Sequence, residues 1–164
     1  MLYARKESNF LNDILGVAEI ASGDISPMKI AILNGNCNEI SKCVVAGTKI
    51  SRERAIAAVS ICRRKFKIED IVLMVVLDDA EDAESGIVFT EKGIFYWLED
   101  EGFVAEIPYG SIKTVDYDEE YAIITTTDDK RVELFCSGEV EDKYSRYMYN
   151  YIMDLKEAYE VSVK

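Results

Sequence analysis

The sequence contains no histidine, and this absence bears first on catalysis. Histidine is the commonest general base in enzymes and the usual activator of serine and cysteine nucleophiles. None of the 164 residues supplies it, and the chain also lacks Gly-x-Ser-x-Gly, a phosphate-binding glycine loop and a dinucleotide fingerprint. We therefore expect a non-catalytic protein that has no catalytic residues and no cofactor.

Cysteine is scarce, and its spacing suits neither metal binding nor disulfides. No Cys-x-x-Cys occurs among the four cysteines, which are Cys37, Cys43, Cys62 and Cys136. Without histidine, a zinc site would need all four of these scattered thiolates. We expect reduced thiols that behave as small apolar side chains, and no metal site.

Long apolar runs are missing as well. No segment approaches the roughly 20 apolar residues that span a bilayer. Acidic Glu7 and Asp13 break the basic-then-apolar plan of a signal peptide, so the expected location is cytoplasmic. Hydrophobic residues nevertheless make up 49% of the chain, which is enough to bury a core and argues against disorder.

The charge of the chain is divided unequally. The net charge is −12, but residues 1–67 hold 11 Lys and Arg against 6 Asp and Glu, whereas residues 68–164 hold 8 against 25. The same boundary separates helical from strand-like patterns, so we expect a helical N-terminal region (1–67) and a strand-rich domain (68–164). The basic region is expected to dock on or beside the acidic domain.

Capping residues and apolar spacing predict helices in the N-terminal region. Four are expected: one after Ser8, a short one from Ser26-Pro27 to Asn34-Gly35, one from about Asn36 to Ala46, and one over Arg52–Phe66. The apolar face of the last is predicted to consist of Ile56, Val59, Cys62 and Phe66.

The opposite face of that last helix is basic and is the candidate binding surface. Its residues are Arg52, Arg63, Arg64, Lys65 and Lys67. Two helices across residues 37–66 also resemble a helix-turn-helix, which makes a DNA-binding regulator the alternative function. However, the turn at Gly47–Ser51 is long for that motif and the second helix has no Asn or Gln to read adenine. Nucleic-acid binding is therefore the less favoured interpretation.

Seven short strands are predicted in the second region, beginning with a hairpin that turns at Thr90–Gly93, where glycine supplies a permissive backbone. The expected strands are Ile71–Leu77, Gly86–Thr90, Gly93–Leu98, Phe103–Ile107, Ile112–Tyr117, Tyr121–Thr126 and Arg131–Cys136. The first is apolar throughout, which suits a strand buried on both faces. Because the turns are too short for parallel crossovers, an antiparallel meander is expected, as a barrel or two packed sheets.

A helical period returns from about Glu139 to Glu160. The residues on its apolar side are Tyr144, Met148, Tyr151, Ile152, Leu155 and Tyr159, with Tyr147 and Ala158 beside them. This amphipathic helix is expected to close an open end of the strand structure.

Three segments resemble a bacterial family of pleckstrin-homology-like (PH-like) domains of mostly unknown function. They are Val72–Asp79, Gly86–Trp97 and Ile107–Ile112, within a similarity that covers about residues 70–155. The resemblance implies an α+β fold in which a seven-stranded antiparallel PH-like barrel is capped by a C-terminal helix. The chain departs from the family at Ala80–Glu84, where an apolar, glycine-containing linker is expected.

The acidic loop 78–84 bears on what a PH-like domain would bind here. Phosphoinositide headgroups need Lys and Arg, whereas this loop carries five carboxylates in seven residues. Its spacing also lacks the glycine and distant glutamate of a calcium-binding EF-hand loop. We expect no membrane partner. The leading function is a protein-interaction or regulatory scaffold with a protein partner, which also allows a homo-oligomer.

Overall fold

The computed structural model describes residues 26–34, 44–46, 52–76, 85–98, 101–135 and 143–163. Its elements in chain order are helix α3 (Pro27–Asn34), strand β1 (Val44–Ala46), helix α4 (Arg52–Ile61), the 3-10 turn η3 (Ile68–Asp70), β2 (Leu73–Val76), β3 (Gly86–Phe89), β4 (Gly93–Leu98), β5 (Gly102–Pro108), the 3-10 turn η4 (Tyr109–Ser111), β6 (Ile112–Tyr117), β7 (Tyr121–Thr126), β8 (Arg131–Phe135) and helix α5 (Lys143–Ser162). The helix expected after Ser8, the acidic loop 78–84 and residues 37–43 lie outside the described residues.

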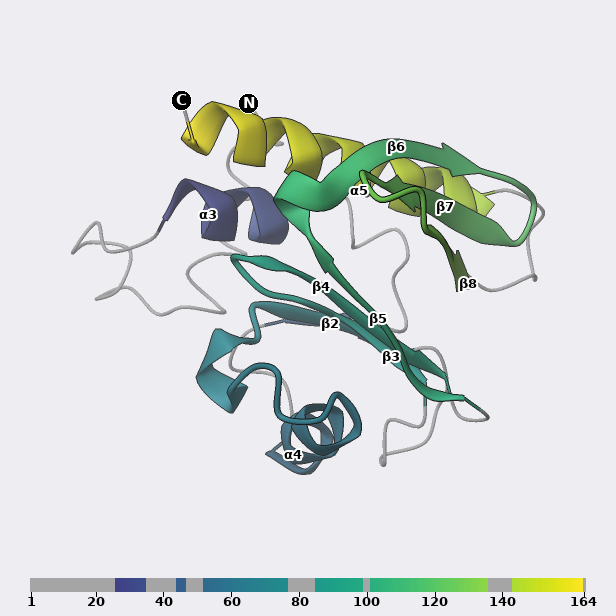
Figure 1. Ribbon diagram of the computed structural model, residues 1–164. Coiled ribbons are helices and arrows are strands. Elements are labelled where there is room, and N and C mark those ends of the chain that lie inside the picture. The colour runs from purple at the N-terminus through teal and green to yellow at the C-terminus, as the bar shows by residue number, and fades with distance from the viewer. Residues whose placement is uncertain are drawn as a thin grey trace.

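All seven expected strands form, and every pairing between neighbouring strands is antiparallel. They belong to two sheets, one of five strands in the order β1-β2-β3-β4-β5 and one of three in the order β6-β7-β8. The expectation of one closed barrel is wrong for the described residues. Strands β5 and β6 are joined through η4 without pairing, and the two sheets cross as separate layers (Figure 1).

The central strands of the larger sheet are buried on both faces. Leu73 and Val75 pack into one core with α3, α5 and the smaller sheet. Met74, from the same strand, packs into a second core with α4 on the other face. Figure 1 shows α4 on one side of this sheet and α3 and α5 on the other. The uninterrupted apolar run of β2 is explained by this two-sided cover.

The turn between β3 and β4 is fixed by hydrogen bonds to Thr90. Thr90 N–H donates to Gly93 O (2.9 Å), and Gly93 N–H donates to Thr90 Oγ1 (3.1 Å). Gly93 was expected to provide unusual backbone angles, but the positive-φ glycine among the described residues is Gly102 (φ 70°). Gly93 is needed for space instead, because a Cβ there would lie 2.6 Å from Ile107 O on β5.

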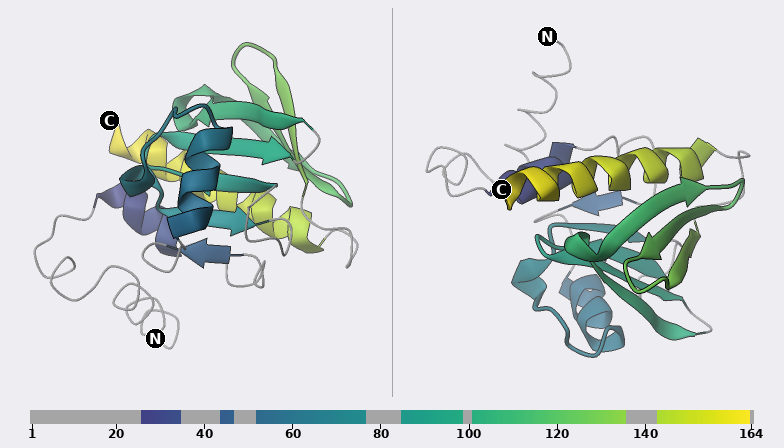
Figure 2. Two further views of the ribbon diagram at one scale, coloured as in Figure 1. Left: turned by 90° about the horizontal axis from the view of Figure 1, so that it is seen from below. Right: turned by 45° about the horizontal axis from the view of Figure 1, so that its top comes forward.

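Helices α3 and α5 lie side by side, and α5 also packs against β6 and β7 of the smaller sheet (Figure 2). Ser26 caps α3 as predicted, since Lys29 N–H donates to Ser26 Oγ at 3.1 Å. The Tyr151 hydroxyl of α5 donates to Ile32 O at 2.7 Å and ties the two helices together. The buried apolar residues of α5 are Met148, Tyr151, Ile152 and Leu155, and all four belong to the predicted stripe. Tyr159 of that stripe is partly buried, and the side chain of Tyr144 lies outside the described residues.

Helix α4 differs from its prediction in both length and face. It ends at Ile61, five residues before the expected Phe66. Ala55 and Ala58 are its buried residues, whereas Ile56 is 47% exposed, so the predicted apolar face is wrong at that position. The alanine side chains let α4 approach the sheet closely. This close packing decides which face of the helix is buried, although Ile56 is the larger apolar residue.

Residues 44–46 form a strand, not the end of a helix. Strand β1 pairs with β2 through Val44↔Val75, Val45↔Met74 and Ala46↔Leu73. Three consecutive residues, Val44, Val45 and Ala46, gain a sheet partner this way, and two of them are β-branched, which favours strands. The helix-turn-helix expectation for residues 37–66 is therefore wrong over its described first part.

Candidate functional site

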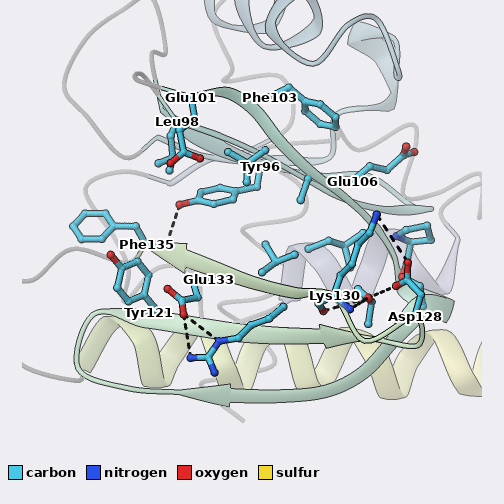
Figure 3. Close-up of a pocket in the computed structure, with 18 of the residues that line it drawn as sticks. Tyr96, Leu98, Glu101, Phe103, Glu106, Tyr121, Asp128, Lys130, Glu133 and Phe135 are labelled. Carbon is cyan, nitrogen blue, oxygen red and sulfur yellow. Dashed lines mark hydrogen bonds and ion pairs between the residues drawn. The ribbon is translucent and has the colours of Figure 1, made fainter.

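A groove runs between the edge strands of the two sheets, β5 and β8 (Figure 3). It has a volume of about 1130 Å³. Its walls come from β5, β8 and the ends of β4 and β7, and the β7–β8 turn forms one end. Neither edge has a further strand neighbour within the part of the chain that the structure describes. The groove is thus the place where the expected barrel stays open.

The floor of this groove is apolar. Tyr96 and Ile107 on the floor are buried, and Leu98, Ala105 and Val132 are partly buried against the main core. Figure 3 shows Tyr96 reaching from the larger sheet toward the end of β8. An occupant of the groove could therefore bury apolar side chains here without displacing the core.

Strand β8 directs part of its backbone into the groove. Thr126 N–H donates to Lys130 O (2.9 Å), so Val132, two residues after Lys130, also faces β7. Backbone direction alternates along an antiparallel strand, which turns the N–H and C=O groups of Arg131 and Glu133 outward. Phe135 follows the same alternation, and its N–H donates across the groove to Tyr96 Oη (3.2 Å).

Strand β5 is a poorer edge for pairing. Tyr109 N–H donates to Lys92 O (3.2 Å), which places the backbone of Ile107 toward β4 and that of Glu106 outward. Pro108, the next outward position, has no N–H to donate. The register of β5 also shifts opposite Tyr96 and Trp97. Proline and bulges are two ways in which edge strands avoid pairing, so β8 is the more open edge.

Ion pairs line the rim of the groove. Arg131 contacts Glu133 Oε1 through its Nε (3.1 Å) and a terminal nitrogen (3.0 Å). Lys65 reaches Glu106 at 3.3 Å. The hydroxyl of Thr126 donates to Asp128 and holds the pKa of that carboxyl below its usual value. Such exposed pairs add little to stability, but they set the charge that an occupant meets.

The five basic residues predicted as a binding surface are all exposed, and none of them lines the groove, although Lys65 reaches its rim through Glu106. Arg52 begins α4, whereas Arg63 and Arg64 follow its end with φ of 58° and 56°, so they lie outside the helix that was predicted to contain them. Arg63 and Lys65 approach the Phe103 ring at 5.7 and 5.8 Å. The basic segment after α4 is thus attached to the outer side of β5.

The groove itself was not predicted. Its wall residues were assigned correctly to strands, but edge positions depend on which strands meet in space. Two local signals were present: Pro108 at a strand end, and the alternation of Arg131 and Glu133 with apolar residues. Proline is typical of an edge strand, whereas the alternation indicates only that one face of the strand is exposed, as it also does for the central strand β7. Neither signal indicates a ligand.

Cys62 lies just after α4 and is fully buried. Burial raises the pKa of its thiol to about 12, so almost none of it is the reactive thiolate near neutral pH. We predict that iodoacetamide leaves Cys62 unmodified in the folded protein and alkylates it in guanidinium, as measured by mass spectrometry of the peptide containing it. Equal labelling rates in both states would contradict this placement.

Comparisons of the chain with protein families, with curated proteins and with solved structures found no match. No helix within the described ranges is both long and apolar enough to cross a membrane. In the same ranges, no three His, Cys, Asp or Glu side chains are grouped so that they could hold a metal ion.

Proposed function

We propose that this protein is a non-catalytic, cytoplasmic protein-interaction module of the PH-like type, and that the groove between β5 and β8 binds a segment of a partner protein. The PH-like assignment is supported by the order of strands β2–β5, strands β6–β8 and then α5, with β1 as an additional edge strand of the larger sheet. A catalytic role is not proposed, because the chain has no histidine and Cys62 is buried with a raised pKa.

The single observation that carries this proposal is that two sheet edges face one groove with an apolar floor. Protein segments recognise such surfaces by adding backbone hydrogen bonds to an edge and placing alternate side chains in pockets. Small-molecule sites usually enclose about 300–1,000 Å³. At about 1130 Å³, this groove exceeds that range and suits a larger occupant.

Electrostatics favour proteins over membranes and nucleic acids as partners. The chain carries a net charge of −12, which repels both anionic lipid surfaces and phosphate backbones. Four carboxylates and two cations line the groove, namely Glu101, Glu106, Asp128, Glu133, Lys130 and Arg131. A third cation, Lys65, reaches the rim through its ion pair with Glu106, so one more carboxylate than cation remains. A neutral or basic protein segment is therefore the best electrostatic match.

Blocking the groove tests this function. Ala105→Trp places a large ring on the groove floor, whereas Thr114→Trp places the same ring on the exposed part of β6, outside the groove. We expect tagged Ala105→Trp protein to recover its partner from native cells at least about tenfold less than the wild type, and Thr114→Trp to match the wild type, with recovery quantified by mass spectrometry.

Circular dichroism and thermal melting should show that both variants are folded before recovery is compared. If Ala105→Trp folds and still recovers the same proteins in the same amounts, the groove is not the binding site and this proposal is wrong.

A further inference from the structure

Resting on the proposed role of the groove, we propose how it binds its partner: an extended segment with alternating apolar and basic residues pairs with β8 as an added strand. The groove floor would receive the apolar side chains, and the rim would receive the basic ones. This assigns the outward backbone groups of Arg131 and Glu133 as the hydrogen-bonding site.

The backbone of β8 sets where the added strand pairs. Arg131 and Glu133 each turn an N–H and a C=O outward, which offers four backbone hydrogen bonds to one extended segment. The bond from Phe135 N–H to Tyr96 Oη occupies the next outward position and marks the end of the pairing region. Strand β5 competes poorly because Pro108 lacks an N–H.

The side chains of β8 determine the pattern of the added strand. On neighbouring strands, residues opposite one another point to the same face of the sheet. The residue opposite Val132 therefore points to the apolar floor beside Ala105 and Ile107. Its neighbours point outward along a rim where four carboxylates face three cations, Lys65 included, in a chain whose net charge is −12. Apolar residues alternating with Lys or Arg satisfy both environments.

A second copy of this chain is the main competing occupant. If two β8 strands paired antiparallel about Val132, Arg131 would lie opposite Glu133 of the other copy, which is electrostatically favourable. However, a second β8 arrives paired to its own β7. The reach of Tyr96 from the larger sheet to the β8 edge shows that the two sheets are close at this end. The space admits a single strand better than a pair.

The experiment uses two labelled peptides and two variants of one residue. The peptides are about eight residues long, enough to follow β8 at about 3.3 Å per residue, and alternate Val with Lys or Val with Glu. Glu133→Pro removes the outward N–H and places a ring in the groove, a substitution that edge strands tolerate. Glu133→Ala removes the same carboxylate and keeps the N–H.

Binding is measured by fluorescence anisotropy on the full chain, and the site is mapped by amide chemical shifts in NMR spectra. We expect the Val/Lys peptide to bind at least about tenfold more tightly than the Val/Glu peptide and to shift the amides of Arg131 and Glu133. Glu133→Pro should weaken binding at least about tenfold, and Glu133→Ala less than about threefold. Only the proline removes the backbone N–H that bonds the peptide, and only its ring blocks the approach of the peptide to β8.

Four results would overturn strand addition. One is equal binding of the two peptides, or none. Another is an equal effect of Glu133→Pro and Glu133→Ala in proteins with the same melting temperature. The third is a dimer in sedimentation that Glu133→Pro disrupts, which would assign the β8 edge to a second copy. If Ala105→Trp abolishes partner recovery while Glu133→Pro leaves it intact, the groove still binds a protein but not by pairing with β8.

Discussion

Replacing Trp97 by alanine is expected to lower the free energy of unfolding by about 3–5 kcal/mol, the range for removing a fully buried aromatic side chain. Trp97 is completely buried on β4 and packs in the core beneath α4, beside Ala55 and Ala58. Its ring also lies over β3, where a Cβ on Gly86 would be 2.6 Å from Trp97 Cζ2. Two small helix residues and one glycine are thus arranged around this single ring, so its removal leaves a cavity among them.

Urea unfolding followed by circular dichroism at helix wavelengths measures this loss, since Trp97 is the only tryptophan and its removal abolishes the usual fluorescence signal. Val104→Ala serves as the control, because Val104 is 37% exposed on β5 and should cost less than about 1 kcal/mol. A loss below about 1 kcal/mol for Trp97→Ala would mean that α4 does not close over this face of the sheet.

The strands of this protein could be predicted from sequence because each one carries its own signal. Apolar and β-branched residues alternate or run together over a few positions, and turn residues separate them. The hairpin at Thr90–Gly93 illustrates this, since its expected turn forms with hydrogen bonds between those two residues. The last helix was also predictable, because Tyr151, Ile152 and Leu155 keep a helical period over several turns.

The features that failed depend on partners far away in sequence. Ile56 fits a helical apolar stripe, but the residue that decides the packing of α4 is Trp97, which accommodates alanine better. Gly93 was assigned to turn geometry, whereas its constraint comes from the backbone of Ile107 on β5. In both cases the local pattern describes the residue itself, an apolar Ile56 and a permissive Gly93. Its role in the fold is decided by a contact with a residue far away in sequence.

The candidate site lay beyond prediction for the same physical reason. Arg131 and Glu133 face the groove with their backbone, and backbone direction depends on which side of β8 already has a neighbour. A sequence shows the alternation of side chains but not which hydrogen-bonding edge of a strand remains open. The basic residues near α4 were more conspicuous, yet Arg63 and Lys65 contact Phe103 of the same chain.

The second large effect is expected from Ile152→Asp in α5. Ile152 is fully buried where α5 meets the main core, whereas its neighbour Met153 is 38% exposed. An ionised carboxylate in an apolar core costs several kcal/mol, which is comparable with the total stability of about 5–15 kcal/mol of a typical domain. We therefore expect Ile152→Asp to be unfolded or aggregated at neutral pH, and Met153→Asp to melt within a few degrees of the wild type.

The pH dependence of the Ile152→Asp variant separates charge burial from mere loss of packing. Burial raises the pKa of the introduced carboxyl above its unfolded value of about 3.9, so the folded state holds a proton that the unfolded state releases. The free energy of unfolding of Ile152→Asp should therefore approach that of Met153→Asp as the pH falls from neutral toward about 4, where the carboxyl is increasingly protonated in both the folded and the unfolded state. A deficit that stays constant over this range would place residue 152 in contact with water, and α5 could not then cover the core as described.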